Sequence, residues 1–93
     1  MTAQQCSKYS SDEIAREMQS RIMDAVGDIE ISLPSNLPYV RSQVRNALDS
    51  LIVDGYLGGG FHNEYETVTE INISKYIPSL DVSFTNRYTG EKL

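Results

Sequence analysis

Residues 37–60, LPYVRSQVRNALDSLIVDGYLGGG, contain the longest helical pattern of this chain and a clear helix stop. Apolar side chains recur there at the spacing of one helix face. They are Val40, Val44, Ala47, Leu48, Leu51 and Ile52. Gly55 follows them, and glycine readily takes the left-handed conformation that ends a helix. We expect a helix that starts at residue 37 or 38, stops at residues 54–55 and supplies the centre of the core.

A second helix is expected upstream, over residues 11–26. Ser10 can cap its first turn, and Glu13 stands three positions on, which completes a capping box. Tyr9 and Ile14 have the spacing of a hydrophobic staple, and Gly27 is a natural helix end. The apolar stripe of this helix consists of Ile14, Ala15, Met18, Ile22, Ala25 and Val26.

Three stretches alternate apolar and polar residues, which is the period of a half-buried strand. Residues 28–33 alternate up to Pro34, which lacks the N–H group that a strand ladder needs. Residues 64–73 alternate with Val68 as an exception, and residues 80–85 alternate after a break at residues 76–79. We expect the last two stretches to pair antiparallel, with the first at an edge of the same sheet.

The predicted fold is therefore α+β, with two helices packed on a small, mainly antiparallel sheet in the order α-β-α-β-β. A length of 93 residues fits one domain, predicted to span residues 10–93 after a flexible tail over residues 1–9. The sequence shows no repeat and no long linker.

The composition of the chain disfavours several classes of function. The net charge of −5, from 13 acidic and 8 basic side chains, disfavours binding to a phosphate backbone, because that affinity comes mostly from Lys and Arg. The one cysteine, Cys6, cannot form an internal disulfide, and no apolar run has the length of a membrane span. The N-terminus lacks the apolar segment of a secretory signal. We expect a cytoplasmic protein, or a virion component if the chain comes from a phage.

Residues 58–60, the glycine triplet, do not fit a phosphate-binding loop. Such a loop joins a strand to a helix and carries a Lys-Ser/Thr pair, whereas this triplet follows a helix and leads to a strand. We interpret it as a flexible joint. His62 is the only histidine, so the usual zinc sets cannot be built, and we interpret it as a surface residue. No catalytic, metal or cofactor site is predicted, and the chain is not expected to be an enzyme.

Three groups of residues are candidates for binding a partner. Glu64, Glu66 and Glu70 form an acidic row that is either a solvated strand face or an electrostatic partner surface. Arg41 and Arg45 lie one turn apart on the exposed side of the main helix, where Asp49 can pair with Arg45. This pair either meets an acidic partner or a phosphate, or belongs to a solvated face. The third group is the apolar side of the last strand, formed by Leu80, Val82 and Phe84.

The stretch VRSQVRNALDSLIVDGYL, residues 40–57, resembles the recognition helix and the following Gly-hydrophobic step of winged-helix transcription regulators. The two later strands would then correspond to the wing. That family has a separate helix before the recognition helix, and residues 28–37 are predicted to be a strand and a loop instead. The acidic net charge also departs from this family.

A longer resemblance, over residues 40–93, is to the C-terminal domain of contractile-tail sheath proteins of phages. It rests on the helix that closes in GYLGG, a strand that ends in Asn72 and Ile73, and LDVSF followed by EKL. In that family this domain lines the inner wall of the sheath and shares its terminal strand with neighbouring subunits. This chain lacks the large outer domains of a sheath protein, so the resemblance implies a reduced relative or a small tail or neck component.

These observations favour a non-enzymatic interaction module. We expect a component of a phage virion (tail, sheath or neck) that binds protein, either copies of itself or other virion subunits, through shared strands. The segment expected to pair with a neighbour is residues 80–93 or the strand beside it, residues 64–74. Alternatives are a winged-helix DNA-binding regulator and a small acidic inhibitor of a nucleic-acid-binding protein. Neither specific nucleic-acid binding nor membrane binding is expected.

Overall fold

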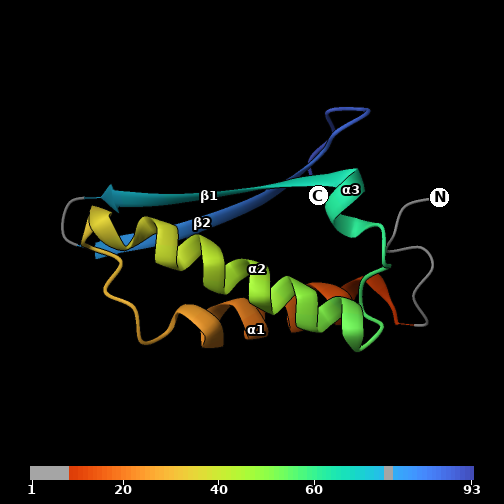
Figure 1. The fold of residues 1–93 in the computed structure, drawn as a ribbon, viewed down its shortest axis with the longest axis horizontal. Coiled ribbons are helices and arrows are strands. Elements are labelled where there is room, and N and C mark those ends of the chain that lie inside the picture. The colour runs from red at the N-terminus through yellow and green to blue at the C-terminus, as the bar shows by residue number, and fades with distance from the viewer. Residues whose placement is uncertain (1–8, 75–76) are drawn as a thin grey trace.

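The computed structural model describes residues 9–74 and 77–93, and its α+β class confirms the predicted fold class (Figure 1). In chain order the elements are α1 (Ser11–Val26), the 3-10 helix η2 (Pro34–Asn36), α2 (Leu37–Val53), α3 (Phe61–Glu64), β1 (Tyr65–Ser74) and β2 (Ile77–Asn86). The predicted tail lies outside the described residues except for Tyr9.

Helix α1 has the bounds and the cap that the sequence predicts. The Ser10 Oγ accepts a hydrogen bond from the Glu13 backbone N–H at 3.2 Å and donates to the Glu13 carboxylate at 3.2 Å. The Tyr9 ring stacks on Tyr56, with 4.1 Å between ring centroids, so the residue before the cap packs on the end of the next helix. The residues that α1 buries are Ile14, Met18, Ile22 and Val26.

Helix α2 also follows its prediction, and its end is a Schellman motif. Gly55 has a φ of 86°, its N–H donates to the Ile52 carbonyl at 3.2 Å, and the Tyr56 N–H donates to the Leu51 carbonyl at 2.9 Å. The predicted core positions Leu48 and Leu51 are 1% and 0% exposed. The chain that leaves this turn buries Leu57 against the same core.

The predicted strand over residues 28–33 is wrong. The segment forms turns between α1 and α2, in which the Ile29 N–H donates to the Val26 carbonyl at 3.0 Å and the Leu33 N–H to the Glu30 carbonyl at 3.4 Å. The Asn36 side chain, at the N-cap position of α2, donates to the Glu30 carbonyl at 2.9 Å and makes no capping hydrogen bond. The alternation is real, but local hydrogen bonds satisfy this backbone, and Ile29 packs against the core without a strand partner.

The sheet is a two-stranded antiparallel hairpin, with a register that runs from Tyr65 opposite Asn86 to Ser74 opposite Ile77. Strand β2 begins before the predicted position, so residues 77–79 of the expected break belong to the strand. Pro78 pairs with Ile73, and proline is tolerated in a strand whose missing N–H faces a free edge. On the inner face of the hairpin, Tyr65, Thr69 and Phe84 are buried.

Helix α3 is a short element at a place where the sequence pattern predicts no helix. It begins after the glycine triplet, and its first residue, Phe61, is 0% exposed. The Phe61 ring stacks on Tyr65 with centroids 5.1 Å apart and meets Phe84 edge-on at 5.6 Å, so it joins β1 and β2 to the core. The glycine triplet is thus the turn that delivers the central aromatic residue.

The neighbourhood of α3 adds one contact that the sequence does not predict. His62 lies in this short helix rather than in a loop, it is half-buried, and its Nε2 lies 2.7 Å from the Asp49 carboxylate. Asp49 is expected from the sequence to offset the charge of Arg45 on the same helix. Because α3 brings the imidazole over α2, Asp49 meets a partner from another element.

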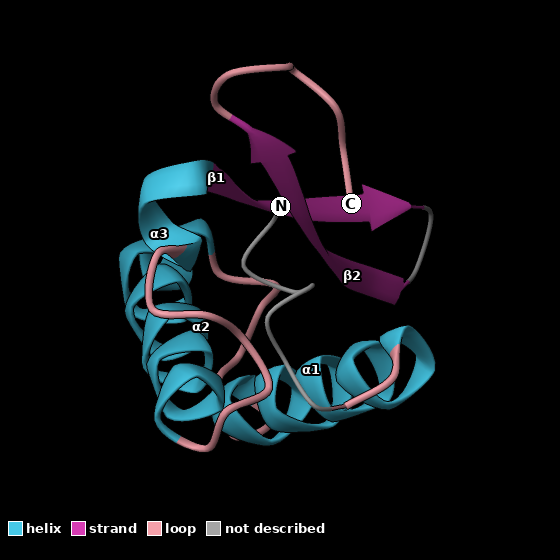
Figure 2. Ribbon diagram, turned by 90° about the vertical axis from the view of Figure 1, so that its right-hand side faces the viewer, coloured by secondary structure: helices cyan, strands magenta, loops and turns pink. Residues whose placement is uncertain are grey.

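The two helices form one layer and the hairpin forms another, but the hairpin does not cover both helices equally (Figures 1 and 2). Helix α2 packs along α1 on one side and against β1 on the other. Helix α1 diverges from β2, as the view along the end of the molecule shows (Figure 2).

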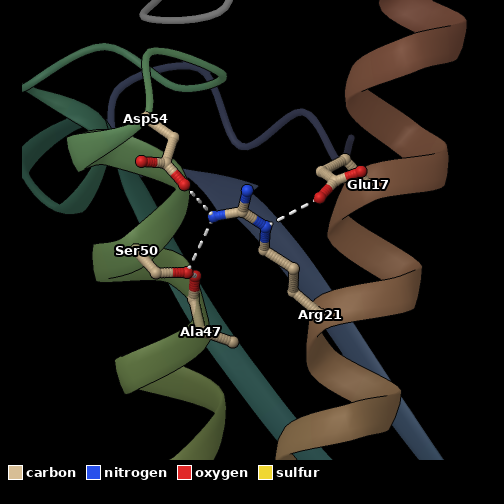
Figure 3. Close-up of polar contacts among 5 residues, drawn as sticks. All are labelled: Glu17, Arg21, Ala47, Ser50 and Asp54. Carbon is tan, nitrogen blue, oxygen red and sulfur yellow. Dashed lines mark hydrogen bonds and ion pairs between the residues drawn. The ribbon is translucent and has the colours of Figure 1, made fainter.

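Arg21 fastens α1 to the end of α2 (Figure 3). Its guanidinium donates to Glu17 at 2.8 Å, to Asp54 at 2.7 Å and to the Ser50 hydroxyl at 3.1 Å, and it lies 5.2 Å from the centroid of the Tyr56 ring. The hydrogen bond to Glu17, followed by the one to Asp54, raises the pKa of the Arg21 guanidinium above its ordinary value. Partial burial, together with the charge of Glu17, raises the pKa of the Tyr56 hydroxyl above 10.0.

Candidate interaction surface

An apolar groove lies between α1 and β2, on the side where these two elements diverge. Its volume is about 770 Å³. The α1 wall consists of Ser11, Ala15, Met18, Gln19, Ile22, Met23 and Val26, and the opposite wall of Leu80, Val82, Phe84 and Leu93. Met23 is 60% exposed and Leu93 is 51% exposed, so large apolar side chains face solvent at the groove. The predicted apolar face of the last strand is therefore one wall of this groove.

The outer edge of β2 runs along the groove, and the last residues of the chain occupy one end of it. The Asn86 N–H donates to the Glu91 carbonyl at 2.7 Å, and the Leu93 N–H donates to the Phe84 carbonyl at 2.9 Å. Backbone groups of a strand alternate between its two sides, so those of Val82 and Leu80 point the same way as those of Phe84. Within the described residues these two positions have no strand partner on that side.

A turn that begins at Asn86 and is held by hydrogen bonds places residues 91–93 on the outer edge of β2. The Asn86 side-chain oxygen accepts hydrogen bonds from the N–H groups of Tyr88 at 2.8 Å and Thr89 at 3.0 Å, and Gly90 has a φ of 76°. The Arg87 N–H donates to the Glu64 carbonyl at 2.7 Å, which ties the turn to α3. This turn is not among the elements predicted from the sequence, although Asn86 and Gly90 are typical turn residues.

The outer face of the hairpin is acidic. The residues that the register places on it include Glu66 and Glu70 from β1 and Asp81 from β2, all exposed. Glu70 lies directly opposite Asp81, an arrangement of like charges that weakens a strand pair. Glu64, predicted to extend this row, is instead the half-buried last residue of α3. The acidic row is therefore made by two strands rather than one.

Arg41 and Arg45 are exposed on α2, as predicted. They line a smaller hollow of about 210 Å³ together with Leu48, His62, Thr67 and Thr69, on the side of the sheet where β1 has its own outer edge. No carboxylate within the described residues forms an ion pair with either arginine. The candidate partner residues thus lie in three places, with the arginines beside β1, the apolar groove beside β2 and the acidic row on the outer face of the hairpin.

The described residues contain no group of His, Cys, Asp and Glu side chains that could hold a metal ion. None of their helices combines the length and the apolar character needed to cross a membrane. Comparison of the chain with protein-family models, curated proteins and solved structures found no match. The two family resemblances of the sequence therefore stay predictions. The proposal about function rests on the groove and the edge of β2.

Proposed function

We propose that this protein is a non-enzymatic interaction module that receives an extended segment of a neighbouring subunit on the outer edge of β2. The observation that carries the proposal is the pairing of residues 91–93 with one end of that edge. These residues lie antiparallel to β2 at one end of the apolar groove, whose β2 wall also includes Val82 and Leu80. An added strand would extend this pairing and cover the groove.

Strand addition suits this edge better than the outer edge of β1. The β1 edge lies over the hollow lined by Arg41 and Arg45, which is smaller and contains two charged side chains. The groove beside the β2 edge is lined mainly by apolar side chains, of which Met23 and Leu93 stay exposed in the isolated chain. Burial of apolar area supplies most of the free energy of such an association, so the β2 edge gains more from a partner.

Strand β1 pairs with β2 inside the same chain, and so do residues 91–93. Within the part of the chain that the structure describes, the stretch around Leu80 and Val82 has no strand partner on this edge. Of the segments that the sequence suggests for pairing with a neighbour, we therefore propose this stretch. The resemblance to contractile-tail sheath domains, in which strands are shared between subunits, is the reason to propose a phage virion as the assembly.

The proposal is tested by native mass spectrometry and sedimentation of the chain co-expressed with proteins encoded beside it. We expect an assembly of defined stoichiometry that is lost in Leu80→Lys and in Met23→Lys, which place a charge on opposite walls of the groove. Val53→Lys is the matched control, because Val53 is 83% exposed and lies outside the groove. A chain that stays monomeric beside these proteins, or groove variants that assemble normally, would contradict the proposal.

A winged-helix regulator is the alternative, favoured by the exposed pair Arg41 and Arg45 and by the hairpin that follows α2. Before α2, however, the chain has turns and a 3-10 helix of 3 residues where that family has a separate helix. We therefore propose that the chain does not bind duplex DNA specifically. Salt-sensitive binding of a duplex at sub-micromolar concentration, lost in the double variant Arg41→Ala with Arg45→Ala, would favour the alternative.

A further inference from the structure

We infer that the segment received by β2 belongs to a different polypeptide and alternates apolar residues with lysine or arginine. This inference rests on the proposed function and adds the chemistry of the partner. Three features carry it: the position of residues 92 and 93 on the edge, the apolar lining of the groove, and the acidic outer face of the hairpin.

Residues 92 and 93 of this chain already show one basic residue followed by one apolar residue at the β2 edge. Lys92 pairs with Thr85, which itself pairs with Glu66 across the hairpin. Side chains opposite one another share a face, so Lys92 belongs to the outer row that contains Glu66. Leu93, the next residue, falls on the other face and lines the groove beside Phe84. A basic residue on the outer face and an apolar residue on the inner face therefore already lie at this edge.

If a partner strand continues the same antiparallel register, the register determines which face of the sheet each of its residues occupies. A strand in line with residues 91–93 would place successive residues opposite Ser83, Val82, Asp81 and Leu80. Residues opposite Val82 and Leu80 point into the groove, where they meet the α1 side chains. Met18 and Met23 are part of that wall, and methionine adapts to apolar side chains of different shape.

The residue opposite Asp81 points to the outer face, where the carboxylates of Asp81 and Glu70 face one another. A lysine or arginine at that position would offset the repulsion between them, whereas an acidic residue would add to it. Among the described residues, Lys92 is the one basic side chain that the register places on this face. The outer row therefore favours a partner that brings positive charge.

A second copy of this chain does not meet these demands. If two β2 edges paired symmetrically about Leu80, both Asp81 carboxylates and their Glu70 neighbours would gather on one face, and like charges there are destabilising. No two basic residues of the sequence stand two positions apart, so no segment of the chain can supply an alternating basic row. The partner strand is therefore assigned to another protein.

The test uses three soluble capped heptapeptides and the full chain. The first has lysine at its odd positions and valine or leucine at its even positions, the second has glutamate in place of lysine, and the third has the residues of the first in an order that breaks the alternation. Affinities are measured by NMR titration at low and high salt. We expect the first peptide to bind at least about tenfold more tightly than the other two, since a tenfold ratio is about 1.4 kcal/mol.

Variants of the chain separate the two faces. Leu80→Lys should abolish binding of the first peptide, and Asp81→Asn should weaken it several-fold, whereas Val53→Lys should leave it unchanged. The amide resonances that move should be those of residues 78–83 and of the α1 wall. Resonances that move mainly around Arg41 and Arg45 would place the peptide elsewhere and overturn the inference.

The outcomes distinguish this inference from the proposed function. Equal binding of the lysine and glutamate peptides, lost in Leu80→Lys, keeps strand addition and overturns the basic pattern. Binding of the scrambled peptide as tightly as the alternating one overturns the pattern as well, because charge alone would explain it. Absence of peptide binding overturns the inference. The proposed function is then decided by the separate test of whether assembly is lost in Leu80→Lys and Met23→Lys.

Discussion

Helix α1 meets α2 on one side and β2 on the other, and the two contacts differ in kind. Toward α2 it buries a continuous apolar stripe, and Arg21 closes the end of that contact with hydrogen bonds to Glu17, Asp54 and Ser50 (Figure 3). Toward β2 it borders a groove of about 770 Å³ with exposed apolar side chains. The first contact is complete within the chain, whereas the second has room for a further polypeptide segment.

The difference teaches which changes should affect folding and which should affect binding. Side chains on the α1–α2 side have their partners in the same chain, so their loss should lower the free energy of unfolding. The exposed side chains of the groove, such as Met23, have few contacts to lose until a partner binds. We expect stability and binding to respond to separate sets of substitutions.

The largest expected effect is that of Leu48→Ala. Leu48 is 1% exposed in the α2 stripe, and its truncation should lower the free energy of unfolding by about 2–5 kcal/mol. Met23→Ala, on the groove side at 60% exposure, should change it by less than about 0.5 kcal/mol. Urea unfolding followed by circular dichroism measures both. Similar losses in the two variants would show that the groove is closed in solution.

A smaller effect is expected from Arg21→Gln, which removes the ion pairs between α1 and α2. Charge-assisted hydrogen bonds that are partly exposed are worth on the order of 1 kcal/mol together, because solvent screens them. Arg16→Gln provides the control, since Arg16 is exposed on the same helix. Unfolding midpoints at low and high salt are compared. An Arg21→Gln protein as stable as Arg16→Gln would mean that apolar packing alone holds the two helices.

The Tyr56 hydroxyl should make the closed side sensitive to alkaline pH. Its pKa in the folded chain is raised above 10.0, so the folded state holds the proton more tightly than the unfolded state does. The resulting stability is present below pH 10.0 and is lost as the pH rises through the folded pKa. Tyr56→Phe should reduce this loss, whereas Tyr88→Phe, at a ring that is 79% exposed, should not. Thermal unfolding between pH 8 and 11 provides the measurement.

Local signals in the sequence predict the two helices of the closed side, but not the Arg21 hydrogen bonds between them. The cap at Ser10, the helical stripe of α2 and the stop at Gly55 each depend on residues within a few positions of one another. The strand over residues 28–33 was wrong because alternation shows which side chains are apolar but not whether another strand is within reach. Phe61 was missed for a related reason, since a helix of 4 residues has no periodic pattern.

The open side depends on contacts between distant parts of the chain, and sequence patterns predicted it only in part. The alternation of Leu80, Val82 and Phe84 predicted an apolar strand face. The divergence of α1 from β2, and the return of residues 91–93 to the strand edge, involve elements far apart in sequence. The opposition of Glu70 and Asp81 follows from the register between β1 and β2, which the alternation of side chains alone does not determine.

The smallest expected effect concerns the carboxylates of Glu70 and Asp81. It involves both the stability of the chain and the binding of a partner strand. Asp81→Lys places opposite charges across the hairpin, which should stabilise the isolated chain by about 0.2–1 kcal/mol. The gain should shrink as salt rises, because both side chains are exposed. The same substitution should weaken binding of the alternating lysine peptide, since the outer row then repels it. Urea unfolding and NMR titration of one protein sample test both signs. Unchanged stability would mean that Glu70 and Asp81 do not interact, and tighter peptide binding would mean that their charge is not what the partner strand meets.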